Sequence, residues 1–542
     1  MLRLFLLISI LLSSVSLSQA SPVTPDWSDS ATIAPTGRSN PYGWDRATLE
    51  TKIRAGKLHA LNYPVEATGL LVPARSALQI LAAKPGDPLF SLMQRVLSLD
   101  PNMQNFTGFW DWIGLHDYPD QDSQIPFPDG VKPDYPMGVS FIQRNGVQGI
   151  TLGCAACHSA ELFGKPILGL TNRFPRSNEF FIEAQKLMKT VTPGLYTTFT
   201  KASVDERAMY ADSRDRIIGV GLKKPAALGL DTSLAQVSLS LSRRGEDEWA
   251  ERSPTNVANP RPNLLDHLVA DSKPAVWWNV KYKTRWLSDG SVTSGNPVFT
   301  NFLWNEIGRG ADLKPLVDWL QNNSDTVEEL TTAVFATKAP RWSDYLDRKF
   351  INVSGAKRGE ILFKTTCQGC HGQYVKQWST LATTKVIYHD KTPVVDVGTD
   401  PGRHEGMQSL EDGLNPLAFS KNFNIVIQTQ KGYVPPPLEG IFSRFPYLHN
   451  NSIPNLCTLM TPPAHRPNVY YSMEPKAAND GFDVDCVGYP ITQTGDDDHR
   501  YDTALEGMSN SGHYEGIFTN QDGSEKFTSS QKQDLREFLK TL

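Results

Sequence analysis

The sequence predicts a mainly α-helical, loop-rich fold in two units, with a short β-hairpin in the first unit. The chain has 542 residues, more than one domain of about 150 residues needs. Its 40 glycines and 38 prolines favour many loops and short elements over long helical bundles. The same five-residue pattern, C-x-x-C-H, occurs at 154–158 and again at 367–371, and we expect one unit around each copy.

Composition and charge exclude several classes of protein. Hydrophobic residues make up 39% of the chain and charged residues 20%, which argues against a disordered tail protein. The formal net charge of -5 provides no excess of basic residues, so we expect no nucleic-acid partner.

The first twenty residues predict a secretory signal peptide. A charged start is followed by an apolar run at 4–17 and by the small residues of a cleavage site that ends at Ala20. The run is too short and too rich in serine to span a bilayer, so we expect no membrane anchor. Cleavage after Ala20 would deliver the protein to the periplasm or the medium, where thiols are oxidised unless something holds them.

Residues 21–130 predict a loop-rich N-terminal extension with many aromatic residues and no evident chemistry. The next unit, 131–345, begins with two runs of β-formers that flank Asn145-Gly146, which predicts a β-hairpin over 139–152. Apolar spacing predicts a helix over 313–320, and Asp325 with Glu328 predicts a capped helix over 325–335. We place the unit boundary near 345.

The two C-x-x-C-H motifs read C-A-A-C-H and C-Q-G-C-H, which is the attachment signature of c-type haem. Two thiols at this spacing reach the two vinyl groups of one porphyrin, and the following histidine can bind the iron. A shared zinc site gives no reason for a histidine after both pairs, and a thioredoxin-like site needs only one pair. We therefore predict two covalently bound c-type haems, held by these residues: Cys154, Cys157 and His158 for haem 1, and Cys367, Cys370 and His371 for haem 2.

The second unit, 346–542, has a helix before its motif and another near its end. Ser354 can cap the first of these, which runs through 356–363 toward Cys367 and resembles the entry helix of small cytochromes c. Thr528 and Gln531 form a capping box for the second, in which apolar residues recur at helical spacing. We expect two cytochrome c-like haem domains.

The two remaining cysteines, Cys457 and Cys486, predict a disulfide, because their number is even and the compartment is oxidising. It would close a loop of about thirty residues and stabilise the fold by roughly 3 kcal/mol. A pair of free buried thiols is the alternative.

The segment 446–456, P-Y-L-H-N-N-S-I-P-N-L, resembles the stretch after the second haem in bacterial di-haem cytochrome c peroxidases and MauG-type enzymes. Together with both haem motifs, S-N-S-G-H at 509–513 and the helix that follows, it is most similar to the rubber-oxygenase-like di-haem cytochromes. Asn451 stands where that family usually has glycine. Asparagine tolerates a positive φ better than most residues, so we expect the turn to be kept.

The sixth ligand of each iron decides between electron transfer and reaction with oxygen or peroxide. For haem 2 the resemblance points to His513, with Met508 and His449 as alternatives, although we expect His449 to hold its turn by hydrogen bonding. For haem 1 no candidate stands out; His116 and His267 lie in its half of the chain. The resemblance implies that haem 1 is open or weakly ligated and is the reactive centre.

An aromatic cluster at 277–286 includes Trp277, Trp278 and Trp286 among several cations. Packing against a haem is the simpler interpretation. The resemblance implies instead that one indole, Trp278 or Trp286, lies between the haems and carries oxidising equivalents. The cations Lys281, Lys283 and Arg285 can pair with haem propionates.

The expected function is that of an exported di-haem oxidoreductase whose haem 1, on His158, reacts with dioxygen or peroxide while haem 2 relays electrons. Oxidative cleavage of an apolar organic substrate, as the resemblance implies, competes with peroxide reduction supplied by a small electron-donor protein. A pure electron carrier with two six-coordinate irons is the third possibility.

Overall fold

The computed structural model describes residues 23–96, 106, 108–121, 124–232 and 234–542. The predicted signal peptide, 1–20, lies outside the described residues. Among the residues that are described, no helix combines the length and the apolar character needed to cross a membrane.

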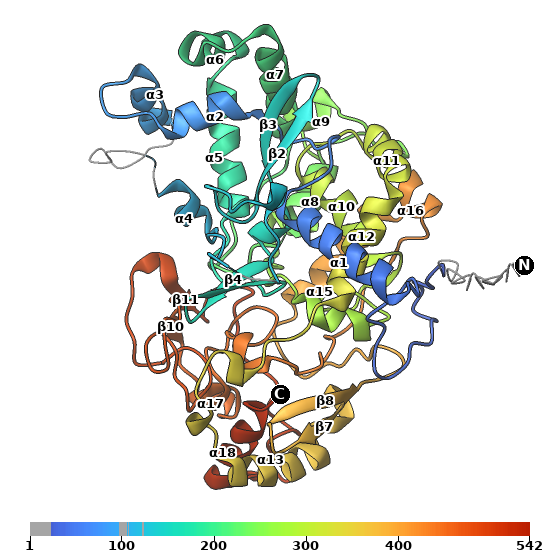
Figure 1. Cartoon of the computed structure of the whole chain (residues 1–542), viewed down its shortest axis with the longest axis vertical. Coiled ribbons are helices and arrows are strands. Elements are labelled where there is room, and N and C mark those ends of the chain that lie inside the picture. Colours follow the sequence, from blue (N-terminus) through green and yellow to red (C-terminus); the bar gives the residue numbers. More distant parts are fainter. Residues whose placement is uncertain (1–22, 97–105, 107, 122–123, 233) are drawn as a thin grey trace, which may run out of the picture.

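The molecule is elongated, with one group of helices at each end (Figure 1). The described residues form eighteen α-helices, and several short 3-10 turns that include η2 (Cys154–Ala156) and η4 (Trp277–Tyr282). The α-helices are α1 (Arg46–Leu61), α2 (Ala74–Leu81), α3 (Pro88–Val96), α4 (Phe109–Ile113), α5 (Ser177–Thr190), α6 (Pro193–Thr200), α7 (Val204–Ile218), α8 (Leu234–Leu241), α9 (Pro254–Ala258), α10 (Pro297–Gly308), α11 (Leu313–Asn322), α12 (Ser324–Ala336), α13 (Val353–Thr366), α14 (Gln368–His371), α15 (Gly402–Leu414), α16 (Ala418–Asn422), α17 (Leu456–Leu459) and α18 (Ser529–Leu539).

The strands form small antiparallel sheets, one of three strands in the order β1-β3-β2 and four of two strands each within the described part of the chain. Their bounds are β1 (Val72–Pro73), β2 (Val139–Arg144), β3 (Val147–Leu152), β4 (Ser159–Leu162), β5 (Lys165–Leu168), β6 (Val292–Ser294), β7 (Gln373–Gln377), β8 (Ala382–Ile387), β9 (Val426–Ile427), β10 (Val469–Tyr471) and β11 (Arg500–Asp502). The fold is thus mixed, and consistent with a mainly α, loop-rich chain. The two-stranded sheets were not predicted.

The predicted hairpin is confirmed. β2 and β3 pair from Val139–Leu152 to Arg144–Val147, and the turn has φ of 52° at Asn145 and 77° at Gly146. Two positive φ values in succession are what this type of tight turn requires. β3 leads directly to the first C-x-x-C-H motif.

The helix starts agree with the sequence in part. The capping box of Thr528 and Gln531 at α18 is confirmed. α13 is capped by Asn352, whose side chain accepts from the Gly355 N–H at 3.0 Å, so the prediction of Ser354 as the cap was wrong. α12 begins after Asn323 without a side-chain cap, so the Asp325–Glu328 box was wrong as well.

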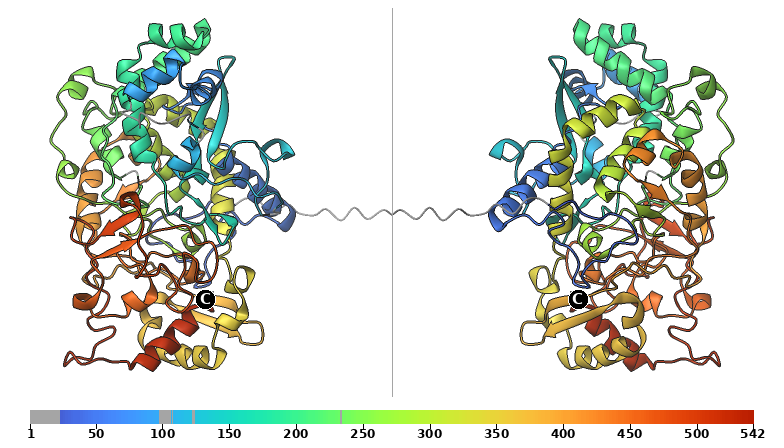
Figure 2. Two further views of the ribbon diagram at one scale, coloured as in Figure 1. Left: turned by 90° about the vertical axis from the view of Figure 1, so that its left-hand side faces the viewer. Right: turned by 90° about the vertical axis from the view of Figure 1, so that its right-hand side faces the viewer.

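Two large hydrophobic clusters fill the interior. The upper core contains the buried faces of α8, α10, α11 and α12, and the lower core contains those of α13 and α18. Both side views show the same division, with α13, α18, β7 and β8 at the lower end (Figure 2). α13 meets α18 closely at Gly359, where a Cβ would clash with the Asp534 carbonyl.

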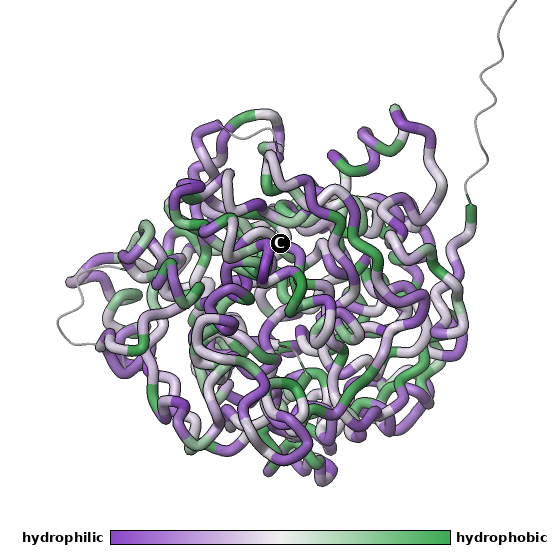
Figure 3. The backbone as a smooth tube through the Cα atoms, turned by 90° about the horizontal axis from the view of Figure 1, so that it is seen from below, coloured by the Kyte–Doolittle hydropathy of each residue, from purple (hydrophilic) through white to green (hydrophobic). Residues whose placement is uncertain are grey.

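Each of the two hydrophobic cores contains residues from both sides of position 345, where the unit boundary was predicted. Met407 and Leu410 of α15 belong to the upper core, and Leu162 and Tyr282 belong to the lower core. The N-terminal segment is also part of this packing, because α1 lies against α12 and β1 pairs with β3. Along the chain, hydrophobic residues recur singly or in short runs between hydrophilic ones (Figure 3).

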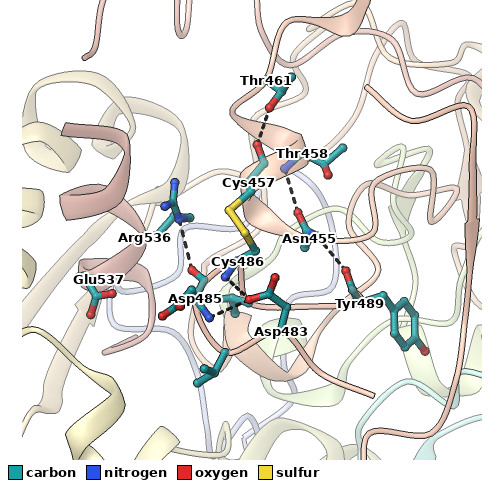
Figure 4. The surroundings of a disulfide bond; sticks show 12 residues. Asn455, Cys457, Thr458, Thr461, Asp483, Asp485, Cys486, Tyr489, Arg536 and Glu537 are labelled. Atoms are coloured by element: carbon teal, nitrogen blue, oxygen red, sulfur yellow. Dashed lines mark hydrogen bonds between the residues drawn. A yellow bond between two sulfur atoms is a disulfide. The ribbon is translucent and has the colours of Figure 1, made fainter. Parts of the chain in front are cut away.

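The predicted disulfide is confirmed between Cys457 and Cys486, with a Cα–Cα distance of 5.0 Å. Figure 4 shows it beside the Asp483 turn, where the Asp483 carboxylate accepts from the Cys486 N–H at 2.9 Å. Arg536 of α18 donates to the Asp485 carbonyl at 3.3 Å, so the disulfide loop is also tied to the helix that packs on α13.

Candidate haem-binding cavity

One cavity of about 570 Å³ is lined by residues of both cores, and both C-x-x-C-H motifs face it. This volume lies in the usual range for small-molecule and cofactor sites. All four motif thiols are free and half-buried in its wall. The wall residues from the motifs are Cys154, Cys157, His158, Cys367, Cys370 and His371.

The first motif leaves β3 through η2 and ends at His158. The His158 carbonyl accepts from the Gly169 N–H at 2.7 Å, and the Gly169 carbonyl accepts from the Trp277 N–H at 3.0 Å. The imidazole of His158 and the indole of Trp277 have ring centroids 5.8 Å apart. Burial lowers the pKa of His158 to about 4, which keeps the imidazole neutral, the form that binds a metal.

The second motif follows α13 and forms α14. The Nδ1–H of His371 donates to the Pro436 carbonyl at 2.8 Å, which fixes the ring and leaves Nε2 available as a ligand. Burial lowers the pKa of His371 to about 4 as well.

His513 lies beside His371, and their ring centroids are 6.2 Å apart with an angle of 49° between the planes. A metal bound by two imidazoles has a metal–nitrogen bond of about 2 Å on each side, to which the distance from nitrogen to ring centre is added. The observed separation therefore fits an iron between the two rings. Burial, together with the neighbouring His371, lowers the pKa of His513 to about 4.

The loop that carries His513 is held mainly by Arg466. Arg466 is 5% exposed, and its guanidinium donates to the carbonyls of Gly512 at 3.0 Å, Leu459 at 3.1 Å and Asn510. A Cβ at Gly512 would clash with the backbone of Gly398 and Thr399, so the close approach requires glycine. Arg466 lies within the loop that the disulfide closes.

The other two candidates for this ligand lie elsewhere. Met508 is fully buried in the lower core and is not part of the cavity wall. His449 lines the cavity, but its ring stacks on Tyr433 with centroids 3.9 Å apart. Asn450, not His449, holds the turn, by donating to the carbonyls of Gly507 at 3.1 Å and Ser509 at 3.0 Å, so that role for His449 was wrong. The expected positive φ of Asn451 is confirmed at 60°.

The structure brings Trp277, rather than the two predicted tryptophans, to the cavity wall. Trp278 is completely buried, and its indole N–H donates to the Glu439 carbonyl at 2.9 Å. Trp286 packs between Trp27 and Phe335, at centroid distances of 6.4 and 6.2 Å. Neither of these two indoles is among the wall residues.

Five basic side chains line the cavity: Lys273, Lys283, Arg309, Arg403 and Arg444. Burial lowers the pKa of Lys283 to about 8 and that of Arg444 to about 10, because desolvation disfavours the charged form of each side chain. Arg403 pairs with the buried Asp289 at 3.0 Å, yet its Nη1 is buried without a partner. Buried cations in excess of their partners fit an anionic group such as a haem propionate.

Of the three cations expected to have this role, Lys283 alone reaches the wall. Arg285 instead pairs with Asp29 at 2.9 Å, and the Lys281 ammonium donates to the Thr337 carbonyl at 3.4 Å. Near the first motif the wall also contains Tyr63, Asp231 and Arg309, which no sequence pattern indicated. Burial raises the pKa of Asp231 to about 7.

Thiols, neutral imidazoles and buried cations in one cavity define a site for c-type haem. Residues 432–471, which include the wall residues Tyr433, Arg444 and His449, match the family model described as RoxA-like, cytochrome c-like. This match supports a haem oxidoreductase of a RoxA-like cytochrome family.

Two curated proteins of Sinorhizobium fredii (strain NBRC 101917 / NGR234) are similar to this chain. The uncharacterized protein y4iJ is 24% identical over 440 residues, which cover 67% of this chain and 72% of that protein. The uncharacterized protein y4iM is 27% identical over 213 residues, which cover 35% of this chain and 49% of that protein.

Proposed function

We propose that this chain is an exported di-haem c-type oxidoreductase in which the first haem reacts with dioxygen or peroxide and the second relays electrons. One observation carries the proposal: both motifs face one cavity, and the ring beside His371 is the imidazole of His513, whereas the ring beside His158 is the indole of Trp277. Bound haem supplies one-electron chemistry and, where a coordination position is open, binding of dioxygen or peroxide.

Different residues of the chain would hold the two haems. The thiol pairs Cys154/Cys157 and Cys367/Cys370 form the thioether links, and His158 and His371 are the proximal ligands. His513 supplies the second imidazole on the side of His371, with its ring held there by the loop that Arg466 fixes. Lys283, Arg403 and Arg444 would pair with the haem propionates.

Openness at the first motif is supported by the positions of the remaining histidines. His116 and His267 are not among the wall residues, and His267 is exposed. His449 does line the wall, where its ring stacks on Tyr433. The ring next to His158 is the indole of Trp277, which offers no lone pair to a metal. We assign the reactive position to this side for that reason.

Oxidative cleavage of an apolar organic substrate is the reaction we favour, since the RoxA-like match agrees with the resemblance of the sequence to rubber-oxygenase-like proteins. Peroxide reduction, with a small protein as electron donor, is the second candidate. Oxygen uptake with polyisoprene, set against peroxide turnover with a reduced cytochrome, distinguishes them.

An EPR and optical spectrum of the oxidised holoprotein tests the ligation. We expect one low-spin haem and one that is high-spin or exchanges its ligand with added anions. His513→Ala should convert the low-spin haem to high-spin, while His267→Ala, at an exposed position outside the wall, should leave both signals unchanged. Two low-spin, six-coordinate haems would contradict the enzyme and leave an electron carrier.

A further inference from the structure

A buried polar cluster lies in the cavity wall beside the first motif. Tyr63, just after α1, donates its phenol proton to Glu306 Oε1 at 2.8 Å. The other carboxylate oxygen of Glu306 accepts from the Gly69 N–H at 2.9 Å, and Arg309 pairs with Oε1 at 3.3 Å. Tyr63 is 2% exposed and Glu306 is 0% exposed, so the cluster is isolated from solvent.

The cluster adjoins the haem thiols. Tyr63 and Arg309 line the cavity, and a Cβ on Gly153, the residue before Cys154, would lie 3.5 Å from the Tyr63 Cβ. Arg309 also donates to the Leu152 carbonyl at 2.8 Å, so it holds the end of β3 where the motif begins. A phenol is thus fixed next to the group that the first motif binds.

The partner of the phenol distinguishes Tyr63 from the other tyrosines of the wall. Tyr433 donates to the Asp400 carbonyl and Tyr447 to the Val487 carbonyl at 3.0 Å. A backbone carbonyl cannot take up a proton at ordinary pH, whereas the carboxylate of Glu306 can. Tyr63 therefore has a base at hydrogen-bond distance, which is the geometry that proton transfer needs.

Because of the charge of Arg309, oxidation of the Tyr63 phenol requires that its proton moves to Glu306. Its guanidinium lies 4.7 Å from the centre of the Tyr63 ring. Loss of an electron alone would leave a cationic phenol beside this charge, and two like charges at such a distance repel strongly in a buried site. Transfer of the proton to Glu306 leaves a neutral phenoxyl group instead.

We propose that Tyr63 is a redox-active residue that stores one oxidising equivalent next to the first haem. After hydrogen peroxide has oxidised that haem, the phenol gives it one electron and passes its proton to Glu306 Oε1. The products are a neutral tyrosyl radical, a protonated Glu306 and a haem reduced by one electron. Return of an electron to the radical and of the proton from Glu306 restores the pair. The inference rests on the proposed function, because it needs a first haem that reacts with peroxide.

Freeze-quenched EPR of the holoprotein after mixing with hydrogen peroxide tests this. We expect a tyrosyl signal, lowered at least tenfold in Tyr63→Phe and in Glu306→Gln, which keeps the size of the side chain but removes the base. Deuterium oxide should slow formation of the signal in the unaltered protein. The optical spectrum of the resting haems is recorded for each variant and should be unchanged.

Two control variants test whether the radical needs both a phenol in the cavity wall and a carboxylate partner for that phenol. Tyr447→Phe removes a wall phenol without a carboxylate partner, and Tyr282→Phe removes a phenol that donates to Glu439 at 2.6 Å but lies outside the wall. Both should keep the radical. A signal that persists in Tyr63→Phe while peroxide still changes the haem spectrum overturns the inference alone. A haem spectrum that does not respond to peroxide overturns the proposed function and the inference with it.

Discussion

The surroundings of the two haem motifs differ in kind. The first is delivered by a strand and bordered by groups that can exchange protons, Tyr63 with Glu306 and the buried Asp231. The second is delivered by a helix and bordered by groups that fix geometry, the disulfide and Arg466. The two sides of one cavity thus draw on different parts of the chain, which is the arrangement that the proposed function, with a reactive position beside a rigid one, requires.

The largest expected effect comes from removing the thiols of one motif at a time. Cys367→Ser with Cys370→Ser should lower the haem content from two to one per chain, measured by haem iron, and remove the low-spin signal. Cys154→Ser with Cys157→Ser should remove the other signal instead. If either pair of substitutions leaves two haems, or if both remove the same signal, the distinction between the two sides is wrong.

Arg466→Gln should loosen the rigid side. Hydrogen bonds to a charged group contribute about 1.5–3 kcal/mol each, so we expect the free energy of unfolding to fall by roughly 4 kcal/mol and high-spin haem to appear. Denaturant unfolding and EPR measure the two effects. The matched control is Arg285→Gln, which breaks the partly exposed pair with Asp29 and should cost about 1 kcal/mol or less. Equal losses in both variants would contradict the role of Arg466.

The disulfide should contribute to the same side. Cys457→Ser with Cys486→Ser opens a loop with a sequence separation of 29 residues. By the chain-entropy relation, the free energy of unfolding should fall by about 3 kcal/mol. Denaturant unfolding under non-reducing conditions measures it, and a loss below about 1 kcal/mol would contradict this estimate.

The proton-exchanging side should show its own pH dependence. Burial raises the pKa of Asp231 to about 7, above the value of about 4 for an aspartate in an unfolded chain. Between these two pH values the Asp231 carboxyl is protonated in the folded protein and ionised in the unfolded chain. This contribution to stability is present at low pH and is lost as the pH rises from about 4 to about 7.

Asp231→Asn should remove that loss, which we expect to be about 3 kcal/mol between these pH values. The free energy of unfolding at pH 4.5 and at pH 8 measures it. Asp205→Asn, at an exposed position of α7, is the control and should keep the slope of the unaltered protein. A slope that Asp231→Asn leaves unchanged would show that the carboxyl is ionised in the fold.

Features set by neighbours in the sequence were predicted well. The hairpin before the first motif, the capping box of α18, the positive φ of Asn451 and the disulfide each depend on a short pattern or on cysteine number. The cap of α13 was misplaced because Asn352 and Ser354 are both good capping residues, and their spacing from the apolar residues does not choose between them.

Features set by distant packing were not predicted. No role was predicted for Arg466 or Tyr63, because only the folded chain brings them to the residues of the two motifs. The same holds for four of the five basic side chains in the wall. The choice of Trp277 over Trp278 depends on which side of a short 3-10 turn faces the cavity, and spacing alone does not determine this.

The cavity wall has a consequence for how the protein is made. Leu535 and Leu539 of α18 complete the wall near the second motif, and Tyr63 completes it near the first, although both lie far from the motifs in sequence. A thioether can form only while a thiol and a porphyrin can still meet. On the proposed function, attachment would precede the docking of these segments, and haem would take part in the folding of the chain that comes to surround it.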